Sequence, residues 1–238
     1  MNDPHALVLS PALAWWDDGG AVAPIVSALE RQGLASDVLD TAAFVEEYGD
    51  IQGVLRGIMG AFDLNRYTLV AGNALGGTLA LLLSARFCPA LPVFTVSSPV
   101  YSSGILSDRL ALVAEHARSG ELGTALTILH HFLTPIGDPP TPADSIPREV
   151  DHDRGSLRLD VSLSLLLDID VREELWAQHT RAVTLIGTRS GLVTERHALL
   201  SPSSSVVRVR GAGMRPHQDR PASLAGPLRR LLLWPGEK

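Results

Sequence analysis

The residues most suggestive of chemistry surround a glycine turn in the first third of the chain. Tyr67 to Leu83 reads as a buried strand, a tight turn and a buried helix, and the turn is Gly72-Asn73-Ala74-Leu75-Gly76-Gly77. A turn of this kind exposes its central side chain, which is a nucleophilic serine in many enzymes. Ala74 occupies that position and has no hydroxyl group. The sequence therefore excludes an acyl-enzyme at residue 74.

The elements that must position this turn alternate along the chain. Short apolar runs are typical of strands buried in a parallel sheet, and segments with a helical period indicate helices. The expected strands span residues 6–9, 37–40, 67–71, 92–96, 182–187 and 205–209. The expected helices span residues 22–32, 43–62, 77–87, 171–178, 194–200 and 221–233. This alternation predicts an α/β fold with a mostly parallel, doubly wound sheet.

Residues 100–178 interrupt the alternation. Their segments are helices at about 106–118 and 121–133, a proline-rich loop at 134–147, and an ambiguous stretch at 156–167. The apolar positions of that stretch fit a strand or a buried helix, and we favour the helix. An insertion after the fourth strand would lie over the carboxyl edge of the sheet. We therefore expect a core of residues 1–99 and 179–238 with a helical lid.

Three segments, in this order and spacing, carry a resemblance to a known family. They are the turn at 72–77, the run Asp170-Val171-Arg172-Glu173-Glu174-Leu175 before Val183–Gly187, and Gly213-Met214-Arg215-Pro216-His217-Gln218-Asp219-Arg220-Pro221. With them the chain resembles the α/β-hydrolase superfamily over nearly its whole length. The resemblance implies the α/β-hydrolase fold with a helical lid insertion, and it does not by itself imply hydrolysis.

The chain departs from that family at several catalytic positions. Ala74 stands at the nucleophile position, and Ser190 stands where the acid is expected after the penultimate strand. A second place for the acid, after the fourth strand, reads Ser97-Ser98-Pro99, and the His-Gly pair common after the first strand reads Ser10-Pro11. The resemblance leaves His217 as the catalytic histidine.

A histidine and two backbone amides would still permit one kind of reaction. The amide of Leu75 at the start of the helix and the amide of Ala12 are candidate oxyanion-hole donors. His217 would be the general base that removes a proton beside a carbonyl group. The leading hypothesis is thus a non-hydrolytic enzyme, a lyase or cyclase, on an acyl or polyketide-like small molecule.

Two alternatives stay open. In the first, Ala74 is an engineered replacement of serine, and the natural protein is an esterase or a thioesterase-like hydrolase. In the second, the chain is a catalytically silent member of the family that binds a ligand or a partner in the lidded cleft. The expected ligand-binding residues are Asn73, Trp15 and Tyr101.

Metal binding and cofactors are not expected. His130 and His131 are neighbours on one helix and cannot both face one ion, and Asp151-His152-Asp153 is expected to be solvated. Four arginines, Arg208, Arg210, Arg215 and Arg220, are expected at the surface.

Composition limits the partners. The net charge of −6 and the short apolar runs argue against nucleic acid and membranes, and the single Cys88 excludes an internal disulfide. We expect a cytoplasmic protein that acts on a small molecule, and a homodimer is neither required nor excluded.

Overall fold

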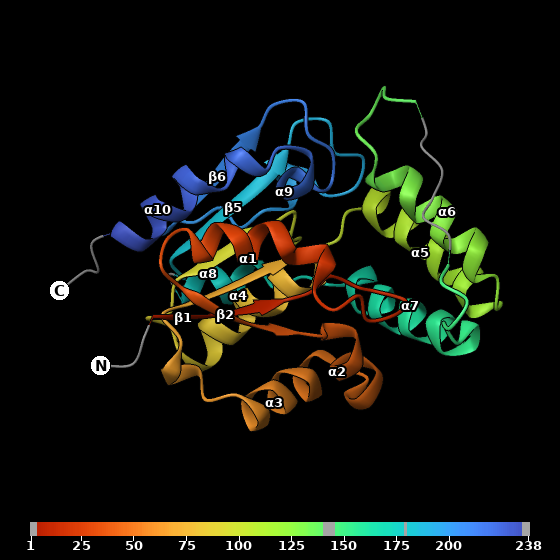
Figure 1. The fold of residues 1–238 in the computed structure, drawn as a ribbon, viewed down its shortest axis with the longest axis horizontal. Coiled ribbons are helices and arrows are strands. Elements are labelled where there is room, and N and C mark those ends of the chain that lie inside the picture. The colour runs from red at the N-terminus through yellow and green to blue at the C-terminus, as the bar shows by residue number, and fades with distance from the viewer. Residues whose placement is uncertain (1–3, 140–145, 179, 235–238) are drawn as a thin grey trace.

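A single parallel sheet forms the centre of the molecule. The computed structural model describes residues 4–139, 146–178 and 180–234. Its strands are β1 (His5–Leu9), β2 (Ala35–Leu39), β3 (Leu69–Asn73), β4 (Val93–Val96), β5 (Ala182–Gly187) and β6 (Ser204–Val209). They pair in the order β2-β1-β3-β4-β5-β6, and every pair is parallel (Figure 1). The chain changes direction of winding between β1 and β3, and ligands bind at such switch points.

Helices cover both faces of this sheet, as the alternation predicts. In β1, Leu7 and Leu9 belong to one apolar cluster, whereas Ala6 and Val8 belong to the other. The helices α1 (Ala23–Glu30) and α10 (Ala225–Leu233) pack on the face of Ala6 and Val8. The opposite face carries α2 (Thr41–Tyr48), α3 (Ile51–Ala61) and α4 (Leu75–Phe87). The doubly wound architecture is thus confirmed.

Three helices between β4 and β5 lie beyond the carboxyl ends of the strands (Figure 1). These lid helices are α5 (Gly104–Arg118), α6 (Leu122–Leu133) and α7 (His152–Leu167). The ambiguous stretch 156–167 lies in α7, so the helix is confirmed and the strand is wrong. The fourth helix of the insertion, α8 (Arg172–Ala177), packs instead on α4, where Glu174 forms a bidentate ion pair with Arg86.

Several predicted boundaries differ from the structure. The expected helix 43–62 is two helices, because Gly49 ends α2 with φ +74° and Asp50 begins α3 by accepting a hydrogen bond from Gly53 N–H. The expected helix 194–200 is only the 3₁₀ turn Glu195–His197.

Shorter helical pieces account for the remaining elements. Within the expected helix 221–233, the 3₁₀ turn Pro221–Ser223 precedes α10. The loop after β6 contains α9 (Pro216–Asp219), and further 3₁₀ turns are Gly20–Val22 and Leu64–Arg66. Of the proline-rich loop, residues 140–145 lie outside the described part. No helix in the described ranges is long and apolar enough to cross a membrane.

Candidate functional site

The glycine turn predicted from the sequence follows the carboxyl end of β3, and its backbone is strained at Ala74. Ala74 adopts φ +48° and ψ −119°, a conformation that costs a non-glycine residue roughly 1–3 kcal/mol. A Cβ atom on Gly76 would lie 2.3 Å from the carbonyl oxygen of Ser10, so only glycine lets α4 start so close to β1. The turn therefore presents Ala74 at the switch point between β1 and β3.

A cavity of about 430 Å³ opens beside Ala74 and is mainly apolar. The lid helices contribute a leucine-rich wall: Leu106, Leu110, Leu126, Leu129, Leu133, Leu159, Leu163 and Leu166. The core side contributes Pro11, Ala12, Leu13, Ala14, Trp15, Leu75, Pro99, Leu192, Val193 and Met214. This size and composition are typical of a site for an apolar small molecule.

Met214 lines the cavity and also contacts Ser190, the residue at the predicted acid position. The hydroxyl of Ser190 lies 3.7 Å from the sulfur of Met214, and both side chains are buried. Met214 lines the cavity together with Ala74. In a catalytic triad the histidine lies between nucleophile and acid. Met214, and not His217, is the residue of this loop that both lines the cavity and contacts Ser190.

His217 lies behind the cavity wall. Its ring is fully buried, and its Nε2 is 2.9 Å from the carbonyl oxygen of Ala21. A carbonyl oxygen can only accept, so Nε2 carries the proton, and Nδ1 has no hydrogen-bond partner among the described residues. Burial lowers the pKa of His217 to about 4, with the charge of Arg215 acting in the same direction. His217 is absent from the described residues that line the cavity, so the structure does not bring it to Ala74.

Of the other predicted site residues, four line the cavity and Tyr101 does not. Asn73, Trp15, Ala12 and Leu75 all line the cavity, and the Asn73 amide also donates to the carbonyl oxygen of Val96. Tyr101 does not line it. Its ring lies under the guanidinium group of Arg172, outside the cavity.

The polar lining comprises Asn73, His130 of α6, and a group of side chains around the loop after β1. Asp17 accepts a hydrogen bond from the Ala21 N–H at 2.7 Å, and Gln218 donates to the Ala21 carbonyl oxygen at 3.2 Å. Arg215, which was expected at the surface with its neighbours, is half-buried and lines the cavity with both residues. That expectation is wrong for Arg215, whereas Arg208 is exposed and forms an ion pair with Glu195.

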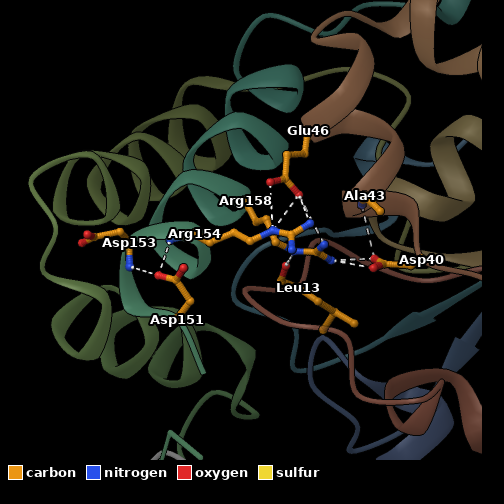
Figure 2. Close-up of polar contacts among 8 residues, drawn as sticks. All are labelled: Leu13, Asp40, Ala43, Glu46, Asp151, Asp153, Arg154 and Arg158. Carbon is orange, nitrogen blue, oxygen red and sulfur yellow. Dashed lines mark hydrogen bonds and ion pairs between the residues drawn. The ribbon is translucent and has the colours of Figure 1, made fainter. Parts of the chain in front are cut away.

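A buried arginine fastens the lid to the core (Figure 2). Arg158 on α7 is 5% exposed; it donates to both carboxylate oxygens of Asp40, at 2.6 and 2.8 Å, and to the carbonyl oxygen of Leu13. Asp40 also caps α2, and Arg154, one turn before Arg158, pairs with Glu46. Since Leu13 lines the cavity, this clamp fixes both the lid and the wall beneath it.

The remaining histidines and carboxylates give no metal site in the described ranges, where no group of three ligand-type residues forms. Asp151 caps α7 through the amides of Asp153 and Arg154. A serine–histidine contact joins Ser103 to His197, but the Thr194 amide donates to Nδ1 of that ring. Nε2 therefore carries the proton, so His197 cannot deprotonate Ser103.

Sequence reasoning missed Met214, Arg215 and Asp17. The signal that could have found Met214 is its place after the glycines of the loop following β6. A Cβ atom on Gly187 would lie 2.0 Å from the Gly213 carbonyl oxygen, so this loop crosses directly over the end of β5. The residue after Gly213 is thereby brought beside Ser190.

Comparisons with known proteins find relatives in structure only. No family model and no curated sequence matches the chain. Its structure is similar to a bromoperoxidase from Bacillus anthracis, with TM-score 0.74 and 13% identity over 97% of this chain and 92% of that one. An α/β-hydrolase enzyme from a Medee basin deep-sea metagenome library gives TM-score 0.73 and 11% identity over 100% and 92%. The enol-lactonase of Burkholderia xenovorans gives 0.72 and 18% over 98% and 92%.

Proposed function

We propose that this chain, which has the α/β-hydrolase fold, binds an apolar, carbonyl-containing small molecule under its lid helices without forming an acyl-enzyme. The contact between Ser190 and Met214 beside the cavity carries the proposal. We assign Ala74, Met214 and Ser190 to the nucleophile, histidine and acid positions of a triad. At those positions they supply neither a nucleophile, nor a base, nor an acid. The described lining residues also include no serine, threonine or cysteine.

The carbonyl group is inferred from the start of α4. The first amides of a helix have no intrahelical acceptor and favour negative charge, and Leu75 and Ala12 both line the cavity. We propose that their N–H groups hold the carbonyl oxygen of the ligand. The leucine-rich wall would cover its apolar body.

If Ala74 were an engineered replacement of serine, restoring that serine alone would not complete a catalytic triad. With serine at residue 74, Met214 would still contact Ser190 at the acid position, and His217 would still bond to Ala21 outside the cavity lining. Non-hydrolytic catalysis with His217 as the general base stays a prediction from the sequence, and the contacts of that ring with Ala21 do not favour it.

Ligand binding without turnover is the direct test. We expect aliphatic acids and esters of medium chain length to raise the melting temperature of the protein, because a ligand that binds only the folded state stabilises it. Mass spectrometry of the same mixtures should recover each compound unchanged. Conversion that disappears in His217→Ala, but not in the exposed control His152→Ala, would overturn the proposal and establish the base.

Rebuilding the triad tests the assignment of its positions. Ala74→Ser alone should give no acyl-enzyme burst with a short activated ester, because the His217 ring stays bonded to Ala21 and Met214 takes its place beside Ser190. Adding Met214→His and Ser190→Asp should produce hydrolysis above the background of the single variant. A burst from Ala74→Ser alone would contradict the assignment and favour a latent hydrolase.

A further inference from the structure

Two charged side chains that line the cavity form no ion pair with any described residue. Arg215 forms no ion pair with any described residue. Asp17 uses Oδ2 to accept from Ala21, while its Oδ1 is buried with no hydrogen-bond partner among the described residues. A buried carboxylate oxygen without a donor is unfavourable, so a bound group that donates to it would be held.

Hydrogen bonds to one residue, Ala21, connect the loop of Asp17 to the helical turn that follows Arg215. Asp17 holds the N–H of Ala21, and Gln218 holds the carbonyl oxygen of the same residue. Arg215 begins the helical turn that carries Gln218, and all three side chains line the cavity. Asp17 and Arg215 form no ion pair with each other or with another described residue, so neither charge in the cavity is neutralised by the other.

We infer that the ligand is a hydroxy-substituted carboxylic acid with an apolar body. This inference rests on the proposed function and specifies its ligand. The guanidinium group of Arg215 recognises the carboxylate, because a planar guanidinium offers paired donors that match a carboxylate. The Oδ1 atom of Asp17 accepts from a hydroxyl group close to that carboxylate. The leucine-rich wall covers the aliphatic part.

The test compares three probes by isothermal titration calorimetry at pH 7.5: decanoic acid, 3-hydroxydecanoic acid and methyl decanoate. The acid should bind the wild-type protein about tenfold more tightly than the ester, and the hydroxy acid should bind more tightly still. Arg215→Gln should abolish the preference for acid over ester while the ester keeps its affinity. Asp17→Ala, which removes the accepting oxygen atoms, should abolish only the preference for the hydroxylated acid.

Neighbouring residues supply matched controls. Arg210→Gln removes a positive charge from an exposed position five residues earlier in the chain, and Asp18→Asn alters the exposed neighbour of Asp17. Both should bind the three probes as the wild type does. Equal affinities of acid and ester in the wild type would overturn this inference and leave the proposed function standing. Binding of none of the probes would overturn both.

Discussion

Single residues decide the shape of the turn that carries Ala74. Gly72, Gly76 and Gly77 each lie where a Cβ atom would meet another group within 2.5 Å, and for Gly76 this group is the rigid backbone of β1 and Ser10. Ala74 itself keeps a positive φ. The geometry of the site thus depends on the absence of side chains as much as on their presence.

Gly76→Ala should therefore destabilise the protein by about 3 kcal/mol or more, because backbone must move to admit the methyl group. The control is Gly60→Ala, on an exposed position of α3 where a Cβ atom has nothing within 4 Å. It should raise the free energy of unfolding by up to about 1 kcal/mol, since alanine favours the helix. Urea denaturation measures both, and equal effects of the two changes would refute the steric argument.

Individual residues were harder to place from the sequence than the elements that carry them. Ala74 lies in the turn after β3 and Ser190 follows β5, whereas His217 was assigned from the resemblance of its loop to that of the α/β-hydrolases and does not line the cavity. Spacing along a loop does not determine which residue faces a cavity. The contact of Met214 with Ser190 depends on how the loop crosses the end of β5, and that crossing is a tertiary property.

At the scale of elements, the lid is held to the core by charge as well as by apolar packing. Arg158 reaches from α7 to the N-terminus of α2 through Asp40, and to the loop after β1 through Leu13 (Figure 2). Asp40 is mostly buried, so loss of its partner would leave a carboxylate poorly solvated.

Arg158→Met should lower the free energy of unfolding by about 3 kcal/mol, although it keeps an apolar stem of similar length. Arg154→Met is the matched control, because it removes an exposed arginine one turn earlier on α7 that also pairs with Glu46. Exposed ion pairs contribute little, so the control should cost less than about 1 kcal/mol. Chemical denaturation compares the two. A control that costs as much as Arg158→Met would show that burial does not set the effect.

Elements were the most predictable level of this molecule. The strands follow from apolar runs, because a strand buried on both faces of a parallel sheet needs nearly continuous apolar side chains. The split between α2 and α3 was missed because a single glycine with positive φ ends a pattern that otherwise continues. The clamp formed by Arg158 was not foreseeable, since its partners lie more than one hundred residues away in sequence.

At the scale of the whole molecule, His217 links two distant parts of the chain. It joins the loop before the last helix to Ala21 in the 3₁₀ turn before α1, through a ring that is neutral and fully buried. Because burial lowers the pKa of His217 to about 4, protonation of this ring opposes the folded state.

This arrangement predicts a loss of stability in mild acid. The unfolded chain takes up a proton at His217 near pH 6.5, whereas the folded chain does so near pH 4, so the contribution is complete above about 6.5 and falls as the pH decreases toward 4. The full effect is about 3 kcal/mol. His217→Gln should flatten the dependence, measured by urea unfolding at pH 7.5 and pH 5, and the exposed control His152→Gln should not. An unchanged slope in His217→Gln would contradict the argument.

The torsion angles at Ala74 have a practical consequence. The backbone at Ala74 already has the strained conformation that a nucleophile elbow requires, while the side chain at this position is only a methyl group. For a protein engineer, the costly part of an active site, its rigid scaffold, is therefore in place. New reactivity could be sought by changing side chains alone, with no loop to be rebuilt.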